Sequence, residues 1–102
     1  MQEIRLTREA KKDLSILYKE YNRRRYAGLS KRQAIYFDPK MADHRKFINL
    51  VKRSVQELTN AGLIKTFILG DFELTDEAIV YMEEKPLGIL KKLLSFIAQF
   101  KP

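Results

Sequence analysis

Polar side chains with hydrogen-bond donors recur at mostly three- and four-residue spacings in the segment Asp43 to Asn60. They are Arg45, Asn49, Lys52, Arg53, Gln56 and Asn60. At about 100° per residue of an α-helix they fall within about 100° of arc, so one helix face would hold them all. Arg can donate two parallel hydrogen bonds to guanine, Asn and Gln can pair with adenine in the same way, and Lys suits phosphate. A merely solvated helix face has the same composition, so this chemistry needs support from the fold.

A second group of cations surrounds the start of a short predicted helix at residues 31–37. Its members are Arg23, Arg24, Arg25, Lys31 and Arg32. The amides at a helix N-terminus can receive phosphate, so these side chains could clamp a nucleic acid backbone, and each contact would add to the salt dependence of binding. The alternative is a solvated loop whose cations favour the C-terminal end of the preceding helix. The sequence leaves both interpretations open.

Other candidate chemistry is weaker. The chain has no cysteine, and its single histidine, His44, has only Asp43 beside it, which is too little for a metal site. No Ser/His/Asp set, glycine-rich phosphate loop or paired-carboxylate motif occurs, so we expect neither enzyme activity nor a cofactor. Aromatic residues among the cations could stack on bases of single strands, but their helical spacing favours packing in the core, with Tyr26 as the expected exception. They are Tyr18, Tyr21, Tyr26, Tyr36 and Phe37.

Composition and charge place these residues in one domain with a polyanion as the leading partner. With 102 residues, 45% of them apolar, the chain can form one hydrophobic core but is too short for two ordinary domains. Residues 1–53 carry 15 Lys/Arg against 6 Asp/Glu, a net +9, whereas residues 54–102 carry 5 against 7, a net −2. This asymmetry favours nucleic acid, with an anionic membrane surface as second choice. No signal peptide or membrane-spanning stretch is expected, which favours the cytoplasm.

Three helices are expected in the first part of the chain. Thr7 can cap a helix from about Arg8 to Arg25, and Gly28 suits the helix exit. Ser30 and Gln33 form a capping-box pattern for a helix at 31–37, which Pro39 ends. Asp43 is expected to cap the helix 43–60, and Gly62 to end it. The inward face of this third helix is predicted to be Phe47, Leu50, Val51, Ser54, Val55 and Leu58.

A β-hairpin and two more helices are expected after Gly62. Residues 63–69 are rich in β-branched and aromatic types, Gly70 and Asp71 suit a two-residue turn, and residues 72–74 alternate. Thr75 can cap a helix at 76–84, and Pro86 separates it from a final helix at about 87–99. The predicted fold class is therefore mainly α with a small β-hairpin.

The order of these elements and two motifs resemble the bacterial winged-helix families. Leu58-x-x-x-Gly62-Leu63-Ile64 leads into the hairpin, and Phe72-x-Leu74-Thr75-x-x-Ala78 leads out of it. MarR-like and PadR-like regulators are similar in outline, and the small YjcQ-like proteins of bacteria and their phages are also similar in size. The likeness covers about residues 8–84 and implies a winged helix-turn-helix.

In such a fold the helix 31–37 would cross the DNA backbone and the helix 43–60 would enter the major groove, with the hairpin as a wing beside it. The resemblance then implies a groove face made of Arg45, Asn49, Lys52, Arg53 and Gln56. Ala78 departs from the Gly that is usual in these families. The wing also departs, since its tip is short and carries Asp71 with Glu73 nearby, and carboxylates repel phosphate. We therefore expect the wing to pack on protein or to sit away from the DNA backbone.

The final helix is apolar around more of its circumference than one core contact needs. Its apolar residues are Leu87, Ile89, Leu90, Leu93, Leu94, Phe96, Ile97 and Phe100. We expect residues 1–86 to form the winged domain and residues 87–102 to form a two-fold homodimer, principally through Leu87, Leu90, Leu93, Leu94 and Ile97. The competing hypothesis is an interfacial membrane helix, which Lys91, Lys92 and Lys101 favour only weakly.

Two functions follow from the sequence as hypotheses. The first is a DNA-binding protein of host or phage origin that binds double-stranded DNA as a dimer and regulates transcription, with half-sites about 34 Å apart. The second is a protein-binding module that keeps the winged fold but uses the apolar last helix or the wing to hold a partner. Binding to DNA should weaken steeply with salt, whereas an apolar protein interface should not.

Overall fold

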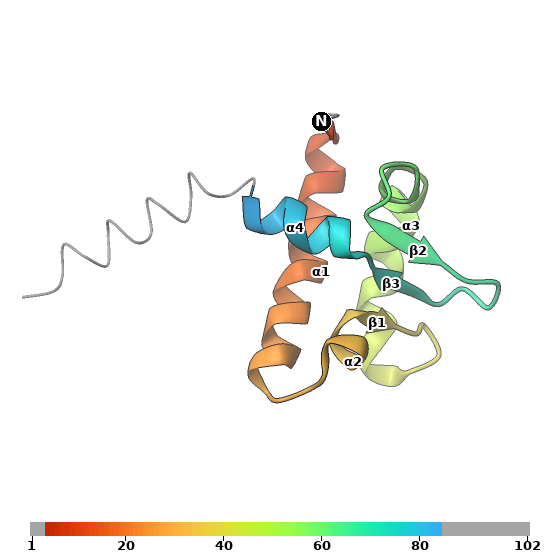
Figure 1. Cartoon of the computed structure of the whole chain (residues 1–102). Helices are drawn as coiled ribbons and strands as arrows, with labels where there is room; N and C mark the ends of the chain where they lie inside the picture. The colour runs from red at the N-terminus through yellow and green to blue at the C-terminus, as the bar shows by residue number, and fades with distance from the viewer. Residues whose placement is uncertain (1–3, 85–102) are drawn as a thin grey trace, which may run out of the picture.

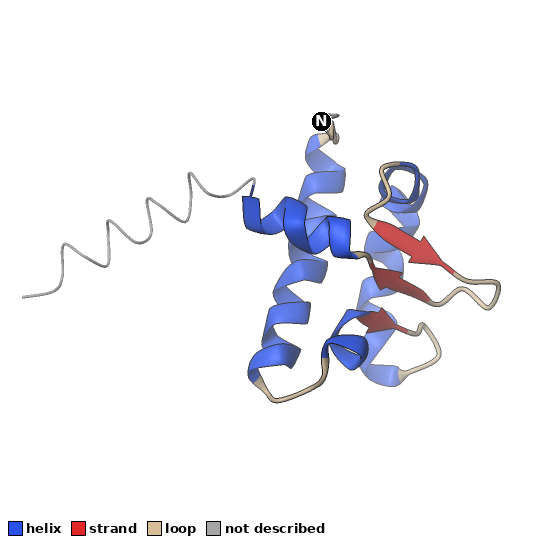
Figure 2. Ribbon diagram, in the orientation of Figure 1, coloured by secondary structure: helices blue, strands red, loops and turns tan. Residues whose placement is uncertain are grey.

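The fold is mainly α with a small antiparallel sheet, as the sequence predicts (Figure 1, Figure 2). The structure, a computed structural model, describes residues 4–84. Its elements run in the order α1 (Arg8–Tyr26), α2 (Lys31–Ile35), β1 (Tyr36–Phe37), the 3-10 turn η1 (Ala42–His44), α3 (Arg45–Asn60), β2 (Ile64–Thr66), β3 (Phe72–Leu74) and α4 (Asp76–Glu84). The strands lie at one side of α1, and α4 lies across it (Figure 1).

The expected caps are present at α1, α2 and α4. Thr7 Oγ accepts a hydrogen bond from the amide of Ala10, and Ser30 and Gln33 satisfy each other's backbone amides in a full capping box. Thr75 Oγ accepts from the amide of Ala78 at 3.2 Å. Gly28 and Gly62 have φ angles of +97° and +74° just after α1 and α3, where a side chain would be strained. These local signals fix where the helices begin and end.

The core lies between α1, α3 and the inner face of the sheet. Phe37 is fully buried at its centre, stacked on Phe72 and edge-on to Phe47, each at 5.1 Å between ring centroids. The predicted inward face of α3 is confirmed: Phe47, Val51, Ser54 and Leu58 are buried, and Leu50 and Val55 are half-buried. Of the aromatic residues expected in the core, Tyr21 and Phe37 are buried there and Tyr18 packs against it, and Tyr26, the expected exception, is 96% exposed. The expectation was wrong for Tyr36, which lies on the outer face of the sheet.

The sheet has the order β1-β3-β2, with both pairs antiparallel. Phe37 pairs with Phe72 and Ile64 with Leu74, and all four side chains are buried. Because side chains alternate along a strand, Tyr36, Glu73 and Lys65 occupy the opposite, outer face. The sheet therefore separates the core from an outer surface.

Two predicted helix boundaries were wrong. The second helix ends at Ile35, and Tyr36 and Phe37 form β1, because they pair with β3, a partner that local sequence does not show. The third helix begins at Arg45, since Asp43 lies in η1 and the residue that precedes the helix is His44, whose side chain makes no capping bond. As a result residues 36–44, with β1 and η1, separate α2 from α3.

The hairpin turn is also longer than predicted. The amide of Gly70 bonds to the carbonyl of Phe67 at 3.0 Å, and the amide of Phe67 to the carbonyl of Asp71 at 2.9 Å. The turn therefore runs from Phe67 to Gly70, with Gly70 at φ +87° in its last position rather than its first. The wing tip is made of Phe67, Ile68 and Leu69, so it is apolar where a short acidic tip was expected.

The predicted final helix, with its dimer residues, lies outside the described residues, as does the boundary at residue 86. Among the helices of residues 4–84, none is long and apolar enough to cross a membrane.

Candidate nucleic-acid interface

One face of α3 is open to solvent and rich in donors. Its buried residues hold the helix against the core, which turns the opposite face outward. We call Arg45, Asn49, Lys52, Gln56 and Asn60 the open face of α3; all five are exposed. Within residues 4–84 none of their side chains has a hydrogen bond or an ion pair to another residue. These donors are therefore available to an external ligand.

Lys46 lies at the border of this face and was not singled out from the sequence. Its ammonium group is 5.0 Å from the centroid of the Phe47 ring, and its side chain is exposed. It adds a third cation to Arg45 and Lys52 on the outward part of the helix. Its position one residue after Arg45 could have identified it.

Arg53 shares this part of α3 but is held within the fold. Its Nη2 donates to Asp13 Oδ1 at 2.7 Å, and its Nε lies 3.1 Å from Glu9 Oε1. Asp13 is fully buried, and its other oxygen accepts from Ser54 Oγ at 2.6 Å. The carboxylate contacts raise the pKa of the Arg53 guanidinium. Arg53 thus joins α3 to α1 and is a poorer base-reading candidate than predicted.

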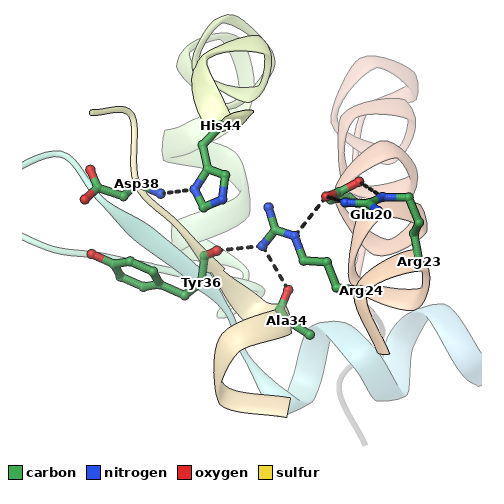
Figure 3. Close-up of polar contacts among 7 residues, drawn as sticks. All are labelled: Glu20, Arg23, Arg24, Ala34, Tyr36, Asp38 and His44. Carbon is green, nitrogen blue, oxygen red and sulfur yellow. Dashed lines mark hydrogen bonds and ion pairs between the residues drawn. The ribbon is translucent and has the colours of Figure 1, made fainter. Parts of the chain in front are cut away.

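Arg24 is a structural residue, contrary to the prediction that it contacts phosphate. Its side chain is only 5% exposed and lies among α1, α2 and β1 (Figure 3). Nε donates to Glu20 at 2.8 Å, and Nη1 donates to the carbonyl oxygens of Tyr36 at 2.7 Å and Ala34 at 3.3 Å. The guanidinium also lies 4.3 Å from the centroid of the Phe37 ring. All of these contacts are internal, so Arg24 leaves the candidate interface.

The carboxylate that accepts from Arg24 is itself shared. Glu20 also accepts two bonds from Arg23, at 2.8 and 2.7 Å. Hydrogen bonds from Arg23, and then from Arg24, outweigh burial and lower the pKa of Glu20 to about 2. The pair with Arg24 is buried within α1, and it holds the guanidinium where Nη1 reaches the carbonyls of Ala34 and Tyr36, which joins α1 to the α2–β1 segment at the cost of removing two charges from water.

His44, which directly precedes α3, contacts the segment after β1. Its Nδ1 accepts from the amide of Asp38 at 2.8 Å, which requires the other ring nitrogen to carry the proton in the neutral form (Figure 3). Burial, and next the nearby charge of Arg24, lower the pKa of His44. The bond to Nδ1 ties the loop at Asp38 to the residue that precedes α3. Among the described residues, no three His, Cys, Asp or Glu side chains form a metal-binding group.

The remaining cations around α2 have different contacts. Lys31 pairs with Asp76 of α4 at 2.7 Å, and Arg25 donates to the carbonyl of Leu29 at 3.1 Å. Arg32 lines a hollow on the outer face of the sheet, on the other side of the sheet from the core against which α3 packs. Arg24 therefore serves the fold, whereas Arg25, Lys31 and Arg32 are exposed, and phosphate binding by these three stays a prediction.

The wing does not present its carboxylates at the tip. Asp71 Oδ2 accepts from the Tyr36 hydroxyl at 2.7 Å, which draws this carboxylate towards β1. The tip itself is apolar: Ile68 is fully exposed and Leu69 is 71% exposed. We expected acidic residues at the tip to keep the wing away from DNA by repelling phosphate. Because the tip is apolar, that reason no longer applies.

The sequence contains a signal for the internal ion pairs, namely charged residues in phase with the apolar face of α1. Asp13, Glu20 and Arg24 lie at three- and four-residue steps from Leu17 and Tyr21, on the apolar face of α1. A charged residue in phase with a buried stripe must find a partner, because an unpaired buried charge is costly.

Comparison with protein-family models, with curated proteins and with solved structures found no match for this chain. The functional argument therefore rests on the chemistry of the site.

Proposed function

We propose that this protein binds double-stranded DNA and regulates transcription, with α3 in the major groove. The observation that carries the proposal is the open face of α3: two cations and three side-chain amides, all exposed and without internal partners in the described residues. Arg45 supplies a two-point donor for guanine, Asn49 and Gln56 match adenine, and Lys52 matches phosphate. The resemblance to winged-helix regulators supports the same orientation.

Rigid support strengthens the proposal. Arg53 and Ser54 tie the middle of α3 to the buried carboxylate of Asp13, and Phe47 and Leu58 anchor its two ends in the core. A helix held in this way presents its outer side chains with little freedom to lose on binding, and pre-organisation of this kind favours affinity.

The test is a fluorescence titration of labelled duplex DNA at about 50 and 200 mM salt. The variant Arg45→Ala/Lys52→Ala removes both cations of the open face without touching an internal contact. We expect its affinity to fall at least roughly tenfold and its dependence on salt to become shallower, because phosphate and base contacts are lost together. Arg53 is left intact so that a loss of binding is not a loss of folding.

Lys12→Ala/Lys19→Ala is the matched control. Both lysines are exposed on the outer side of α1, and the substitution removes the same charge. The control should retain wild-type affinity to within about twofold, since distant surface charges act only through a screened field. Equal affinity of wild type and the α3 variant would refute the proposal, as would an equal loss in the control.

The homodimer proposed from residues 87–102 has its own test, a mass measurement in solution. A dimer mass at micromolar concentration is expected. A monomer mass at that concentration would remove the proposed two-fold DNA site.

The apolar wing tip favours a second candidate function, a protein-binding module. Exposed apolar side chains in sequence, here Phe67, Ile68 and Leu69, mark contact surfaces when they are not covered by the fold. If the wing binds a protein, that binding should be insensitive to salt, and Ile68→Ser/Leu69→Ser should abolish it. The same variant should leave the DNA affinity unchanged. Loss of DNA affinity in this variant would instead assign the wing to the DNA interface.

A further inference from the structure

The single histidine of the chain, His44, lies where the segment after β1 meets α3. Its ring Nδ1 accepts a hydrogen bond from the backbone amide of Asp38 at 2.8 Å (Figure 3). A backbone amide can only donate, so this bond exists while Nδ1 keeps its lone pair, which requires a neutral ring. The contact therefore depends on the protonation state of one side chain.

The other hydrogen bonds of the segment 38–44 are shorter in range. The amide of Met41 bonds to the carbonyl of Asp38 at 3.0 Å, and the amide of His44 to the carbonyl of Met41 at 2.9 Å. The amide of Lys40 bonds to Asp38 Oδ1 at 3.0 Å. Each of these joins residues two or three positions apart, whereas the side chain of His44 joins the last residue of the segment to the first. Loss of the His44 bond would therefore release the two ends of the segment from each other.

The ring of His44 also faces a fixed positive charge. The Arg24 guanidinium lies 4.3 Å from the centroid of the Phe37 ring, and the His44 ring centroid lies 5.9 Å from the same point. Figure 3 shows this guanidinium between Glu20 and the histidine. Arg24 is bonded to Glu20 and to the α2–β1 backbone, so it cannot move away without losing those bonds. A second positive charge on the ring would be repelled by it.

Three carboxylates act in the opposite direction. They are Asp38 of the segment, Asp43 of η1 and Glu20 of α1. Asp43 is exposed, and Glu20 already pairs with two guanidinium groups. Burial, and next the charge of Arg24, outweigh the carboxylates and lower the pKa of His44 from its ordinary value of 6.5. The neutral ring therefore stabilises the fold above pH 6.5, and this contribution is lost as the pH falls below that value.

We propose that protonation of His44 opens the segment 38–44 and makes the start of α3 sensitive to pH. The protonated ring carries a hydrogen on Nδ1, which would point at the amide hydrogen of Asp38, so the bond is lost. Arg45 directly follows His44 and is the first residue of α3, so the opening disturbs the cation that begins the open face. The consequence for DNA rests on the proposed function, whereas the opening of the segment does not.

The experiment is a pH titration of isotope-labelled full-length protein by NMR, from about pH 8 to about pH 5. We expect the ring signals of His44 to titrate with a midpoint below 6.5 and the amide signal of Asp38 to follow the same midpoint. Below it, protection of the Asp38 amide from hydrogen exchange should fall at least about tenfold relative to its intrinsic rate, while the amide of Leu17 in α1 stays protected. A midpoint at or above 6.5, or an Asp38 amide that does not follow the ring, would overturn the proposal.

Two variants assign the effect. His44→Asn places an amide oxygen near the position of Nδ1, where it can accept from Asp38 but does not titrate, so the Asp38 amide should no longer change over this pH range. Asp38→Asn keeps the backbone donor and removes a carboxylate that favours the charged ring, so the midpoint of His44 should move to lower pH. The same pH response of Asp38 in His44→Asn as in the wild type would refute the proposal.

Duplex DNA supplies the second readout. The affinity of the wild type should fall roughly threefold or more from about pH 7.5 to about pH 5.5, the size of one hydrogen bond, and that of His44→Asn should not fall. Added positive charge alone acts in the opposite direction, because it strengthens binding to DNA. An equal fall in both proteins would overturn the assignment to His44. Opening of the segment in a protein that binds no DNA at any pH would support this inference and refute the proposed function alone.

Discussion

The open face of α3 and the cations around α2 both carry exposed or charged donors, but they differ in how far the fold uses those donors. Around α2, Arg24 donates hydrogen bonds to Glu20 and to two backbone carbonyls, and Lys31 forms an ion pair with Asp76. On α3, Arg45 and Lys52 have no such partner in the described residues. From this difference we expect a basic stretch to form a binding surface only where the fold leaves its donors unused, and the predictions below test that expectation.

The largest expected effect is the loss of stability in Arg24→Ala. Removing Arg24 leaves two carbonyl oxygens without this donor and Glu20 with Arg23 as its remaining cation, which should lower the free energy of unfolding by about 3–5 kcal/mol. Urea denaturation measures it. Arg25→Ala, the exposed neighbour, should change it by at most about 0.5 kcal/mol. Equal stability of both variants would show that Arg24 is not a structural cation.

A related effect should appear at acid pH. The pKa of Glu20 is about 2 in the fold, against an ordinary value of 4.5 that we assign to the unfolded chain. Its ionised form therefore stabilises the fold above pH 4.5, and this contribution, up to about 3 kcal/mol, is lost as the pH falls from 4.5 towards 2. Unfolding free energies between pH 6 and 2 measure it. Glu20→Gln should flatten this part of the curve, and an identical slope in the variant would disprove the assignment.

Arg53→Ala should have an intermediate effect on stability. It leaves the buried Asp13 with Ser54 as its remaining side-chain donor, so we expect a loss of about 1–3 kcal/mol. Lys52→Ala, one residue earlier and without a side-chain hydrogen bond or ion pair in residues 4–84, should leave stability unchanged and lower the DNA affinity. Thermal denaturation and DNA titration of the two variants separate these roles. A loss of stability in Lys52→Ala together with a loss of DNA affinity alone in Arg53→Ala would contradict these assignments.

The smallest effect is expected for Lys31→Ala. Its pair with Asp76 is exposed on both sides, and such pairs contribute about 0–1 kcal/mol. Neither stability nor DNA affinity should change by more than that. A large loss of DNA affinity would restore α2 as a phosphate-binding element.

Local sequence signals predicted much of the fold. Thr7, Ser30 and Thr75 cap helices as expected, and Gly28 and Gly62 end them, because these effects involve only neighbouring residues. The strand β1 was missed because Tyr36 and Phe37 depend on pairing with β3, far along the chain. The turn of the wing was misplaced because Gly70 suits its last position as well as its first.

The sequence predicted the part of the candidate site that depends on the helical period, and missed the part that depends on contacts between elements. The helical period placed Arg45, Asn49, Lys52 and Gln56 on one exposed face, and the structure keeps them there. The period alone did not show that Arg53 would reach Asp13 on another helix, or that Arg24 would meet Tyr36 on a strand. Which donors stay free is a property of the packing.

The most direct measurement is a chemical-shift map of the isotope-labelled protein on addition of a duplex DNA. We predict that the side-chain amides of Asn49 and Gln56 and the Nε signal of Arg45 shift, while the Nε signals of Arg24 and Arg53 stay in place. Shifts concentrated at Arg25, Lys31 and Arg32, with α3 unaffected, would contradict the assignment of α3 as the DNA-reading element.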